Sequence, residues 1–332
     1  MKIAFFEVEE WEKPLLSEKL HGDDLVFYPD PLTIENVAIA KDFEMISVFV
    51  CSTINKEVID QLPHLKFVTT RSTGFDHIDT AYCKERHIVA CNVPHYGTHT
   101  VAEHTFALIL ALSRKLFVSI DGTKRGEFDH SNLLGFDLYG KVLGIFGLGD
   151  IGISVARIAK GFGMNVVAYS RHPSEALARE LGISFLEFNE VLSLSDIITL
   201  HVPYSKETEH MINKKNIKKF KKGSLLINTA RGGLVETESL LFGLEKGILG
   251  GAGLDVLEEE NLIKEERQLI GRHGVKSADL RTLYYDHILM KLDNVVITPH
   301  NAFNSKEALE LILDVTVQNI LAFEDKKMQN TV

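Results

Sequence analysis

Arg231, the acidic run Glu258-Glu259-Glu260 and His300 each come a few residues after a short apolar run that predicts a β-strand. Ligands in open α/β sheets bind beyond the carboxyl ends of the strands, so we expect the arginine, the acidic run and the histidine at one edge. A guanidinium can hold a carboxylate, and an imidazolium can donate a proton while hydride arrives at a carbonyl. A carboxylate beside the imidazole fixes its tautomer. The combination suits the reduction of a 2-oxo acid, although each residue alone has a structural or solvated alternative.

A glycine-rich sequence, GLGDIG at 147–152, joins a predicted strand at 142–146 to a predicted helix at 153–162. In this context the spacing is typical of a dinucleotide-binding loop, because the helix N-terminus then faces the pyrophosphate. The first glycine allows a tight turn, the second lets the backbone approach the anion, and the third allows close helix–strand packing. An ordinary structural turn is the alternative. The residues assigned to cofactor binding here are Gly147, Gly149, Asp150, Ile151 and Gly152.

The residues that follow the next predicted strand, 165–169, bear on the choice of cofactor. NAD-binding loops carry an acid about 20 residues beyond the glycines, where it binds the adenosine ribose. This chain has Ser170 at that distance and Arg171 beside it. With no acid to repel it, a 2′-phosphate can accept a hydrogen bond from Ser170 and pair with Arg171, so we expect NADP to be favoured or both cofactors to be used. The alternative is that Arg171 is a solvated loop charge and NAD binds without its usual acceptor.

Short apolar runs alternate with longer helical patterns along most of the chain. The runs are continuous rather than strictly alternating, which indicates strands covered on both faces. Strands that alternate with helices predict βαβ units and parallel sheets, so the expected fold class is α/β. The 332 residues leave room for about two domains. The predicted strands are residues 3–8, 45–51, 66–70, 88–91, 142–146, 165–169, 196–200, 224–228, 251–254 and 294–298.

Residues 100–120 predict a single helix that begins with a capping box, Thr100 followed by Glu103. Its side chains are apolar almost all round, so it must be buried on several sides. One interpretation is that the helix bridges two domains and also faces a second subunit. The other is that it is the central core helix of one monomer.

Charge and cysteine content limit the partners and the compartment. Lys and Arg number 36 against 46 Asp and Glu, a formal net charge of −10, which disfavours nucleic acid and anionic membranes as partners. Cys51, Cys83 and Cys91 predict neither a disulfide framework nor a zinc site, so no metal is expected. Acidic residues at 7, 9 and 10 interrupt any signal-peptide core, and no apolar stretch is long enough to span a bilayer. We expect a protein of the reducing cytoplasm.

Seven motifs, in order along the chain, resemble those of the D-isomer-specific 2-hydroxyacid dehydrogenases, most closely the D-lactate dehydrogenase branch. The resemblance runs from about residue 45 to residue 303. It implies an enzyme that transfers hydride between NAD(P)H and a small 2-oxo acid, pyruvate or a bulkier analogue, to give the D-2-hydroxy acid. The motifs are RSTGFDHID from Arg71, VAEHTFALIL from Val101, GLGDIG from Gly147, HVPYSKETEHMIN from His201, INTARGGLV from Ile227, GLDV from Gly253 and ITPHNAF from Ile297.

The resemblance also implies roles for the residues at matching positions. Arg231 would bind the substrate carboxylate, His300 would be the general acid/base, and Glu260 would be the acid that partners the histidine. Backbone N–H groups of Thr73 and Gly74 would face the carboxylate, and the other substrate positions would be Cys51, Tyr96 and Phe303. The remaining cofactor positions would be Val101, His201, Val202, Pro203, Thr229, Ala230 and Asp255.

Members of this family fold as two Rossmann- or flavodoxin-like domains, with the cofactor domain inserted into the substrate domain. The resemblance therefore predicts a substrate domain of residues 1–99 and 300–332 and a cofactor domain of residues 100–299. It also implies a homodimer paired through the cofactor domains, which agrees with the apolar pattern at 100–120.

The sequence departs from the family pattern at three places. Ser170 and Arg171 replace the aspartate of NAD-using members. An added segment, residues 268–290, of unassigned role lies between Glu260 and His300. Cys51 stands where D-lactate enzymes often have a bulky aromatic residue, so the substrate pocket is roomier unless a neighbouring side chain compensates.

Several other functions occur on the same fold. Formate-oxidising relatives pair the histidine with glutamine, whereas Glu260 is an acid. Oxidation of formate or phosphite is therefore a weaker interpretation. A serine-biosynthesis dehydrogenase often carries a regulatory domain, and this sequence stops at Val332. Long disordered tails would favour a dinucleotide-sensing corepressor, a binding protein with slow or no turnover, and none is predicted. Reduction of hydroxypyruvate or glyoxylate is a further alternative.

Overall fold

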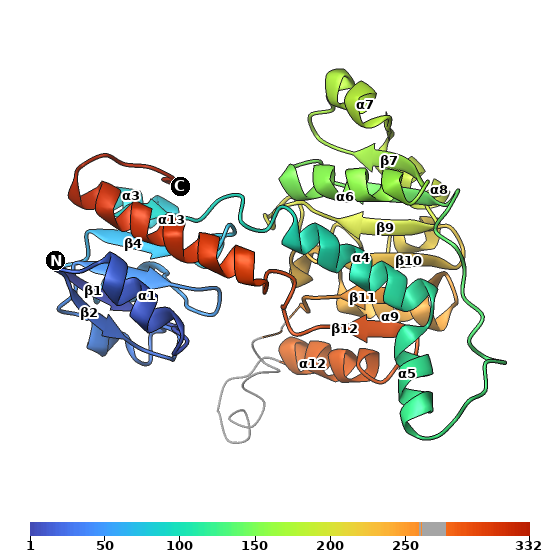
Figure 1. Ribbon diagram of the computed structural model, residues 1–332, viewed down its shortest axis with the longest axis horizontal. Coiled ribbons are helices and arrows are strands. Elements are labelled where there is room, and N and C mark those ends of the chain that lie inside the picture. Colours follow the sequence, from blue (N-terminus) through green and yellow to red (C-terminus); the bar gives the residue numbers. More distant parts are fainter. Residues whose placement is uncertain (259, 261–276) are drawn as a thin grey trace. The chain divides into compact units, whose positions relative to one another are not determined.

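The computed structural model describes residues 1–258, 260 and 277–332, and this part of the chain forms two compact units. Unit 1 consists of Met1–Tyr96 and Asn304–Val332, and unit 2 is the intervening segment Gly97–Phe303. Unit 2 is thus a continuous segment inserted into unit 1 (Figure 1). The junctions fall at 96/97 and 303/304, three or four residues from the 99/100 and 299/300 expected from the sequence.

Unit 1 is built on a five-stranded parallel sheet in the order β2-β1-β3-β4-β5. In this doubly wound order the strands that follow β1 and β3 lie on opposite sides, so the topological switch point is between β1 and β3. β3 and β4 are buried along their whole length, as continuous apolar strands covered on both faces should be. The strands are β1 (Lys2–Phe5), β2 (Asp24–Phe27), β3 (Met45–Val48), β4 (Phe67–Thr70) and β5 (Val89–Cys91).

Two apolar clusters hold helices against opposite faces of this sheet. Phe5 and Phe67 point into the cluster that includes side chains of α1 and α13, whereas Ala4 and Val68 point into the cluster of α2 and α3. α13 follows unit 2 in the sequence and therefore completes the core of unit 1 when the chain returns. The helices are α1 (Glu12–Lys19), the 3-10 helix η1 (Val37–Ala40), α2 (Lys56–Ile59), α3 (Thr80–Glu85) and α13 (Lys306–Glu324).

Unit 2 is built on a seven-stranded parallel sheet in the order β12-β11-β10-β9-β6-β7-β8. The first three strands of the unit run outward on one side and the next four on the other, which is the Rossmann order with its switch point between β6 and β9. The strands are β6 (Val142–Phe146), β7 (Asn165–Tyr169), β8 (Ser184–Phe185), β9 (Ile197–Leu200), β10 (Ser224–Asn228), β11 (Leu249–Leu254) and β12 (Val295–Ile297).

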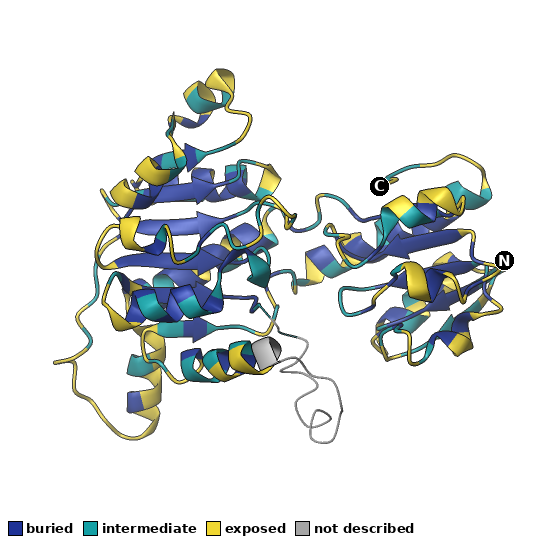
Figure 2. Ribbon diagram, turned by 180° about the vertical axis from the view of Figure 1, so that it is seen from behind, coloured by how far each residue is buried: buried dark blue, intermediate teal, exposed yellow. Residues whose placement is uncertain are grey.

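Helices cover both faces of this sheet and bury its strands (Figure 2). Side chains of α4 and α6 share one apolar cluster with β6 and β10, and side chains of α8, α9 and α12 share the cluster on the other face. The helices of unit 2 are α4 (Thr100–Ser113), α5 (Leu116–Lys124), α6 (Asp150–Gly161), α7 (Glu175–Leu181), α8 (Phe188–Leu194), η2 (Ile217–Lys219), η3 (Gly232–Leu234), α9 (Thr237–Glu245) and α12 (Ser277–Leu289).

The single helix expected at 100–120 is wrong, because the structure has two helices there. α4 ends at Ser113, and Lys115 adopts the left-handed conformation with φ of +50°, a common way to end a helix. The expected capping box is also absent: the N-cap of α4 is His99, which makes no side-chain capping bond, and Thr100 is the first helical residue.

The expected strands are all present, several of them shorter than predicted, whereas β2 and β8 were not predicted. Both are short edge strands, so they give no clear periodic signal. Of the added segment at 268–290, residues 268–276 lie outside the described residues and most of the remainder forms α12. Within the described part of the chain, no helix combines the length and apolarity needed to cross a bilayer.

Candidate active site

The loop at 147–152 has the backbone geometry that a bound pyrophosphate requires. Gly147 follows β6 with φ of +93°, and a Cβ there would lie 2.5 Å from the carbonyl oxygen of His201. A Cβ on Gly152 would lie 2.1 Å from the carbonyl oxygen of Gly147, so only glycine lets α6 pack this closely. A Cβ on Gly149, the N-cap of α6, would instead meet no atom within 4 Å. Open space therefore lies before the helix N-terminus, and these residues fit a dinucleotide.

Side chains in and beside this loop are exposed or half-buried. Asp150 is exposed and Ile151 is half-buried in the first turn of α6. Ser170 is half-buried directly after β7, and its Oγ accepts a hydrogen bond from the backbone N–H of His172 at 3.2 Å. Arg171 is exposed. Because β7 is the neighbour of β6, Ser170 and Arg171 stand at the strand end where the adenosine ribose is expected.

His201, Val202 and Pro203 follow β9, the strand on the other side of the switch point. The Nε2 of His201 lies 2.9 Å from the hydroxyl of Thr199. Burial lowers the pKa of His201 to about 3, so its imidazole is neutral at physiological pH. This segment therefore carries no charge, and Val202 is half-buried and Pro203 exposed.

The turn after β10 carries Arg231 and is fixed by Asn228, which is 1% exposed. The Asn228 amide donates to the carbonyl oxygen of Arg231 at 2.8 Å, and its oxygen accepts from the N–H of Ala230 at 3.1 Å. The hydroxyls of Thr229 and Thr105 are 2.9 Å apart, which ties the turn to α4. The Arg231 guanidinium donates to the carbonyl oxygen of Ala230 at 2.9 Å and is half-buried. The turn after β10 and helix α4 thus together position the backbone of Arg231.

Asp255, 1% exposed at the end of β11, organises the turn that follows β12. Its carboxylate accepts from the backbone N–H groups of Asn301 and Ala302, each at 2.8 Å, and from the hydroxyl of Thr298. The Nε2 of His104, on α4, lies 3.4 Å from the same carboxylate. Burial alone would raise the pKa of Asp255, but hydrogen bonds from His104, Thr298 and the two N–H groups outweigh it and hold the pKa below its usual value. The group is therefore an ionised anchor.

His300 and Glu260 form a hydrogen-bonded pair. The Nδ1 of His300 lies 2.7 Å from Oε1 of Glu260, and the side chains are 18% and 25% exposed. His300 has φ of +50°, and its N–H donates to the carbonyl oxygens of Asp255 at 2.8 Å and Thr298 at 2.9 Å. The ring of Phe303 packs edge-on against the imidazole at 6.4 Å. With Nδ1 turned to the carboxylate, Nε2 is the nitrogen able to exchange a proton with a substrate.

The acidic run at 258–260 contributes more than Glu260. Oε1 of Glu258 lies 2.5 Å from Nε2 of His210, and Oε2 accepts from both the N–H and the hydroxyl of Thr237 at 2.9 and 2.6 Å. Glu258 therefore ties the segment before Glu260 to the start of α9. Glu259 lies outside the described residues.

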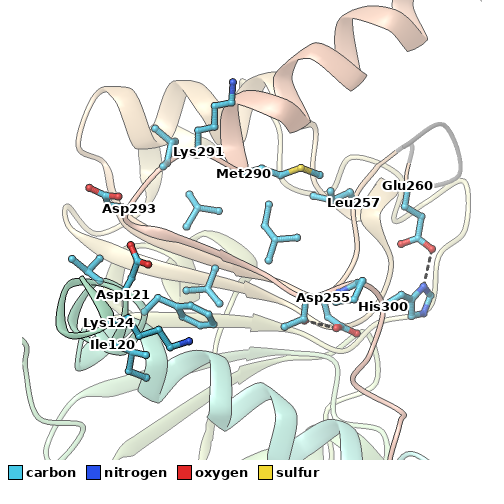
Figure 3. Close-up of a pocket in the computed structure, with 18 residues that line it drawn as sticks. Ile120, Asp121, Lys124, Asp255, Leu257, Glu260, Met290, Lys291, Asp293 and His300 are labelled. Atoms are coloured by element: carbon cyan, nitrogen blue, oxygen red, sulfur yellow. Dashed lines mark hydrogen bonds and ion pairs between the residues drawn. The ribbon is translucent and has the colours of Figure 1, made fainter. Parts of the chain in front are cut away.

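A cavity of about 690 Å³ in unit 2 reaches the His300–Glu260 pair. Figure 3 shows this pair at one end of the cavity and Asp121 and Lys124 of α5 at the other. The walls between them are mainly apolar and come from α5, the edge strand β12, the segment at 290–293 and Leu257. The pair therefore borders open space within unit 2 alone.

The remaining expected substrate residues follow strands of unit 1. The hydroxyl of Thr73 donates to the carbonyl oxygen of Val93 at 2.8 Å, and Gly74 is half-buried beside it. Cys51 is half-buried three residues beyond β3, and Tyr96 is half-buried at the junction with unit 2. These positions follow β3, β4 and β5, so they share the carboxyl edge of the unit 1 sheet.

Sequence reasoning missed four residues that hold the candidate catalytic side chains in place: Asn228, Thr105, His104 and Thr298. For two of these residues the sequence contained a weak indication of a structural role. His104 and Thr105 are polar residues in an otherwise apolar, buried helix, and such residues need partners. Val101, an expected cofactor residue, is 8% exposed one turn earlier on α4.

Comparison with known proteins connects this geometry to one family. The profile of the D-isomer specific 2-hydroxyacid dehydrogenase NAD binding domain matches residues 106–302. The chain is 37% identical to a 2-hydroxyacid dehydrogenase homolog of Zymomonas mobilis over 96% of both chains, and 34% identical to a glyoxylate reductase of Thermococcus litoralis over 96% of this chain and 88% of that one. The crystal structure of D-lactate dehydrogenase from Aquifex aeolicus, complexed with NAD and lactic acid, has a TM-score of 0.90 at 37% identity and covers 98% of this chain and 96% of that one. The chain belongs to the D-isomer-specific 2-hydroxyacid dehydrogenase family.

Proposed function

We propose that the protein reduces a small 2-oxo acid to the D-2-hydroxy acid with NAD(P)H, and that Arg231, Glu260 and His300 are its catalytic residues. The observation that carries this is the 2.7 Å pair of His300 and Glu260, in the same unit as a glycine loop that fits a dinucleotide. Pyruvate and glyoxylate are the first substrates to test, because relatives of this chain are D-lactate dehydrogenases and glyoxylate reductases.

In this mechanism each catalytic group has one task. The cofactor, when bound, supplies or accepts the hydride. Nε2 of His300 donates the proton to the carbonyl oxygen, while Glu260 on Nδ1 fixes the tautomer and stabilises the imidazolium. Arg231 binds the substrate carboxylate with two parallel hydrogen bonds and polarises the neighbouring carbonyl. In the oxidation direction, neutral His300 removes the proton from the hydroxyl group.

The same family pattern assigns the remaining contacts. Backbone N–H groups at 149–151 would hold the pyrophosphate, and the segments at 201–203 and 229–231 would line the groove with Asp255 and Val101. Thr73, Gly74 and Tyr96 would meet the substrate from unit 1, with Cys51 and Phe303 shaping its side-chain pocket. In domain terms, unit 2 would be the cofactor domain and unit 1 the substrate domain.

For the cofactor we favour NADPH over NADH. Ser170 stands at the position where NAD-using relatives have an acid that would repel a 2′-phosphate. The exposed Arg171 supplies a positive charge beside the hydroxyl group of Ser170. Water screens an exposed arginine, so the expected preference is at most about tenfold. Equal or stronger use of NADH would refute this choice.

For the assembly we propose a cytoplasmic homodimer. Leu116, Phe117 and Ile120 of α5 are 43%, 58% and 53% exposed, an apolar face that a second copy would cover. All three cysteines lie in the described part of the chain and none forms a disulfide, in keeping with a reducing compartment. Light scattering should give twice the mass of 37.2 kDa. Ile120→Asp should give monomers, whereas Leu194→Asp on the similarly exposed face of α8 should not.

The decisive experiment tests a panel of 2-oxo acids of increasing size with NADH and with NADPH. Turnover is measured as the loss of absorbance of the reduced nicotinamide. Turnover of at least one acid, with the D product identified by chiral chromatography, is the expected result. If pyruvate is reduced faster than larger acids, a neighbouring side chain compensates for the small side chain of Cys51. No turnover with any acid, together with measurable dinucleotide binding, would instead support a sensor function.

A further inference from the structure

Glu7 lies at the topological switch point of the unit 1 sheet, two residues beyond β1 and beside the loop that follows β3. This is the position at which open α/β sheets receive their ligands. The backbone of Glu7 has φ of +58°, which non-glycine residues rarely adopt. Here the carboxylate of Glu7 itself is bound by the loop that follows β3.

Four hydrogen-bond donors of the loop at 49–52 converge on this carboxylate. Oε1 accepts from the N–H of Cys51 at 2.8 Å, and Oε2 accepts from the N–H groups of Phe49 at 3.0 Å and Ser52 at 3.1 Å. The hydroxyl of Ser52, which is 1% exposed, also donates to Oε2. Nearby backbone N–H groups turned toward one anion form a nest of the kind that binds phosphates and carboxylates.

Arg71 holds the backbone that presents Glu7. Its guanidinium is 2% exposed and donates to the carbonyl oxygens of Phe6 at 2.7 Å and Glu7 at 2.6 Å, and to the hydroxyl of Ser47 at 3.1 Å. The carboxylate of Glu12 lies 3.7 Å away and balances its charge. Since Arg71 directly precedes the loop of Thr73 and Gly74, one network joins the loops after β1, β3 and β4.

We propose that Glu7 is a positioning residue whose carboxylate occupies the anion nest of residues 49–52 and fixes the loop that carries Cys51. The proposal deepens the proposed function and rests on it, because this loop is the one expected to border the 2-oxo acid. Filling the nest also denies these N–H groups to the substrate carboxylate. The substrate carboxylate is thereby directed to the N–H groups of Thr73 and Gly74 and to Arg231.

Cys51 provides a reporter that does not depend on activity. Burial raises the pKa of Cys83 and of Cys91 to about 11, so at pH 8 an alkylating reagent should modify the half-buried Cys51 first. In Glu7→Gln an amide NH₂ faces at least one backbone N–H of the nest in either orientation, so the loop should loosen. Cys51 alkylation, measured by mass spectrometry, should accelerate several-fold.

The same variant should raise KM for the 2-oxo acid about tenfold to a hundredfold, the range for losing charge-assisted hydrogen bonds. KM for the cofactor should not change, because the glycine loop belongs to unit 2. The matched control is Glu10→Gln, which removes the same charge from an exposed ion pair with Lys13. It should leave both KM values and the alkylation rate at wild-type levels.

Chemical rescue tests the nest itself. Glu7→Gly removes the side chain at a position whose positive φ suits glycine, so the loss is not confounded by backbone strain. Added propionate should refill the nest and slow Cys51 alkylation in Glu7→Gly, whereas the same concentration of chloride should not, and wild type should show no such change. If Glu7→Gly does not fold, alkylation of Glu7→Gln decides alone.

Wild-type alkylation rates in the folded Glu7 variants, or no effect of propionate on Glu7→Gly, would overturn the proposal. A wild-type protein that reduces no 2-oxo acid would overturn the proposed function instead. In that case the alkylation and rescue measurements still decide for or against the nest.

Discussion

Replacing Asp255 by asparagine tests whether this buried carboxylate holds the turn that carries His300. In wild type, one carboxylate oxygen accepts from Asn301 and Thr298, and the other accepts from Ala302. An asparagine has one acceptor oxygen, so in either orientation its NH₂ group faces a backbone N–H. A buried N–H without an acceptor costs about 1–3 kcal/mol.

This cost should be visible in thermal unfolding. About 2–4 °C of Tm is lost per kcal/mol for a domain of this size, so Asp255→Asn should lower the Tm of unit 2 by about 2–12 °C. We expect added cofactor to shift the calorimetric transition of unit 2 upward, which identifies that transition. Because the asparagine displaces the turn around His300, kcat should also fall about tenfold to a hundredfold. The control is Asp293→Asn, an exposed residue just before β12, which should change neither quantity.

The pH dependence gives a further check with a definite sign. The pKa of folded Asp255 is depressed, so its contribution to stability is fully present above the unfolded pKa of about 3.9. It is lost as the pH falls through the folded pKa, since the protonated acid no longer accepts all of its hydrogen bonds. The stability difference between wild type and Asp255→Asn should therefore shrink below about pH 4. A variant with wild-type Tm and kcat, or a difference that stays constant with pH, would refute the reasoning.

The other predictions concern the proposed catalytic and cofactor residues. His300→Asn keeps a residue that tolerates positive φ but removes the proton donor, so kcat should fall about 10²–10⁴-fold in both directions; near wild-type turnover would exclude His300 as the acid/base. Glu260→Gln removes the charge that stabilises the imidazolium, so the reduction rate should decline at a lower pH than in wild type, and an unshifted profile would remove Glu260 from the mechanism. Arg231→Lys should raise KM for the 2-oxo acid and lower kcat, because an ammonium cannot bind a carboxylate bidentately. Arg171→Ala should weaken NADPH binding more than NADH binding in titrations, whereas Ser170→Asp should reverse the preference; equal effects on both cofactors would rule out a 2′-phosphate contact.

The fold class and the family were predictable because their signals are local. The GLGDIG spacing can be read within six residues, and Gly152 is required by a contact with Gly147, five residues away. The buried parallel strands are continuous apolar runs that need no tertiary information. The break at Lys115 was not predictable in the same way. Lysine has a high helical propensity, so nothing in the local sequence predicts the left-handed conformation that Lys115 adopts between α4 and α5.

The supporting residues of the site were beyond sequence reasoning for a different reason. The 3.4 Å approach of His104 to Asp255 joins positions 151 residues apart, and the nest of Glu7 joins positions more than 40 residues apart. Neither residue type has a spacing rule that predicts such a contact. The strand ends predicted an acid close to His300, but the choice of Glu260 within the acidic run at 258–260 came only from the family resemblance.

The insertion of unit 2 into unit 1 sets the order in which the two cores can close during synthesis. Unit 2 is one continuous segment, so it can fold as soon as Phe303 has left the ribosome. Unit 1 cannot, because Leu313 and Val317 of α13 belong to the apolar cluster around Phe67. Until α13 has been made, one face of the unit 1 sheet lacks its cover and offers an apolar surface to chaperones or to another nascent chain. This face of the unit 1 sheet therefore stays without α13 throughout the synthesis of unit 2.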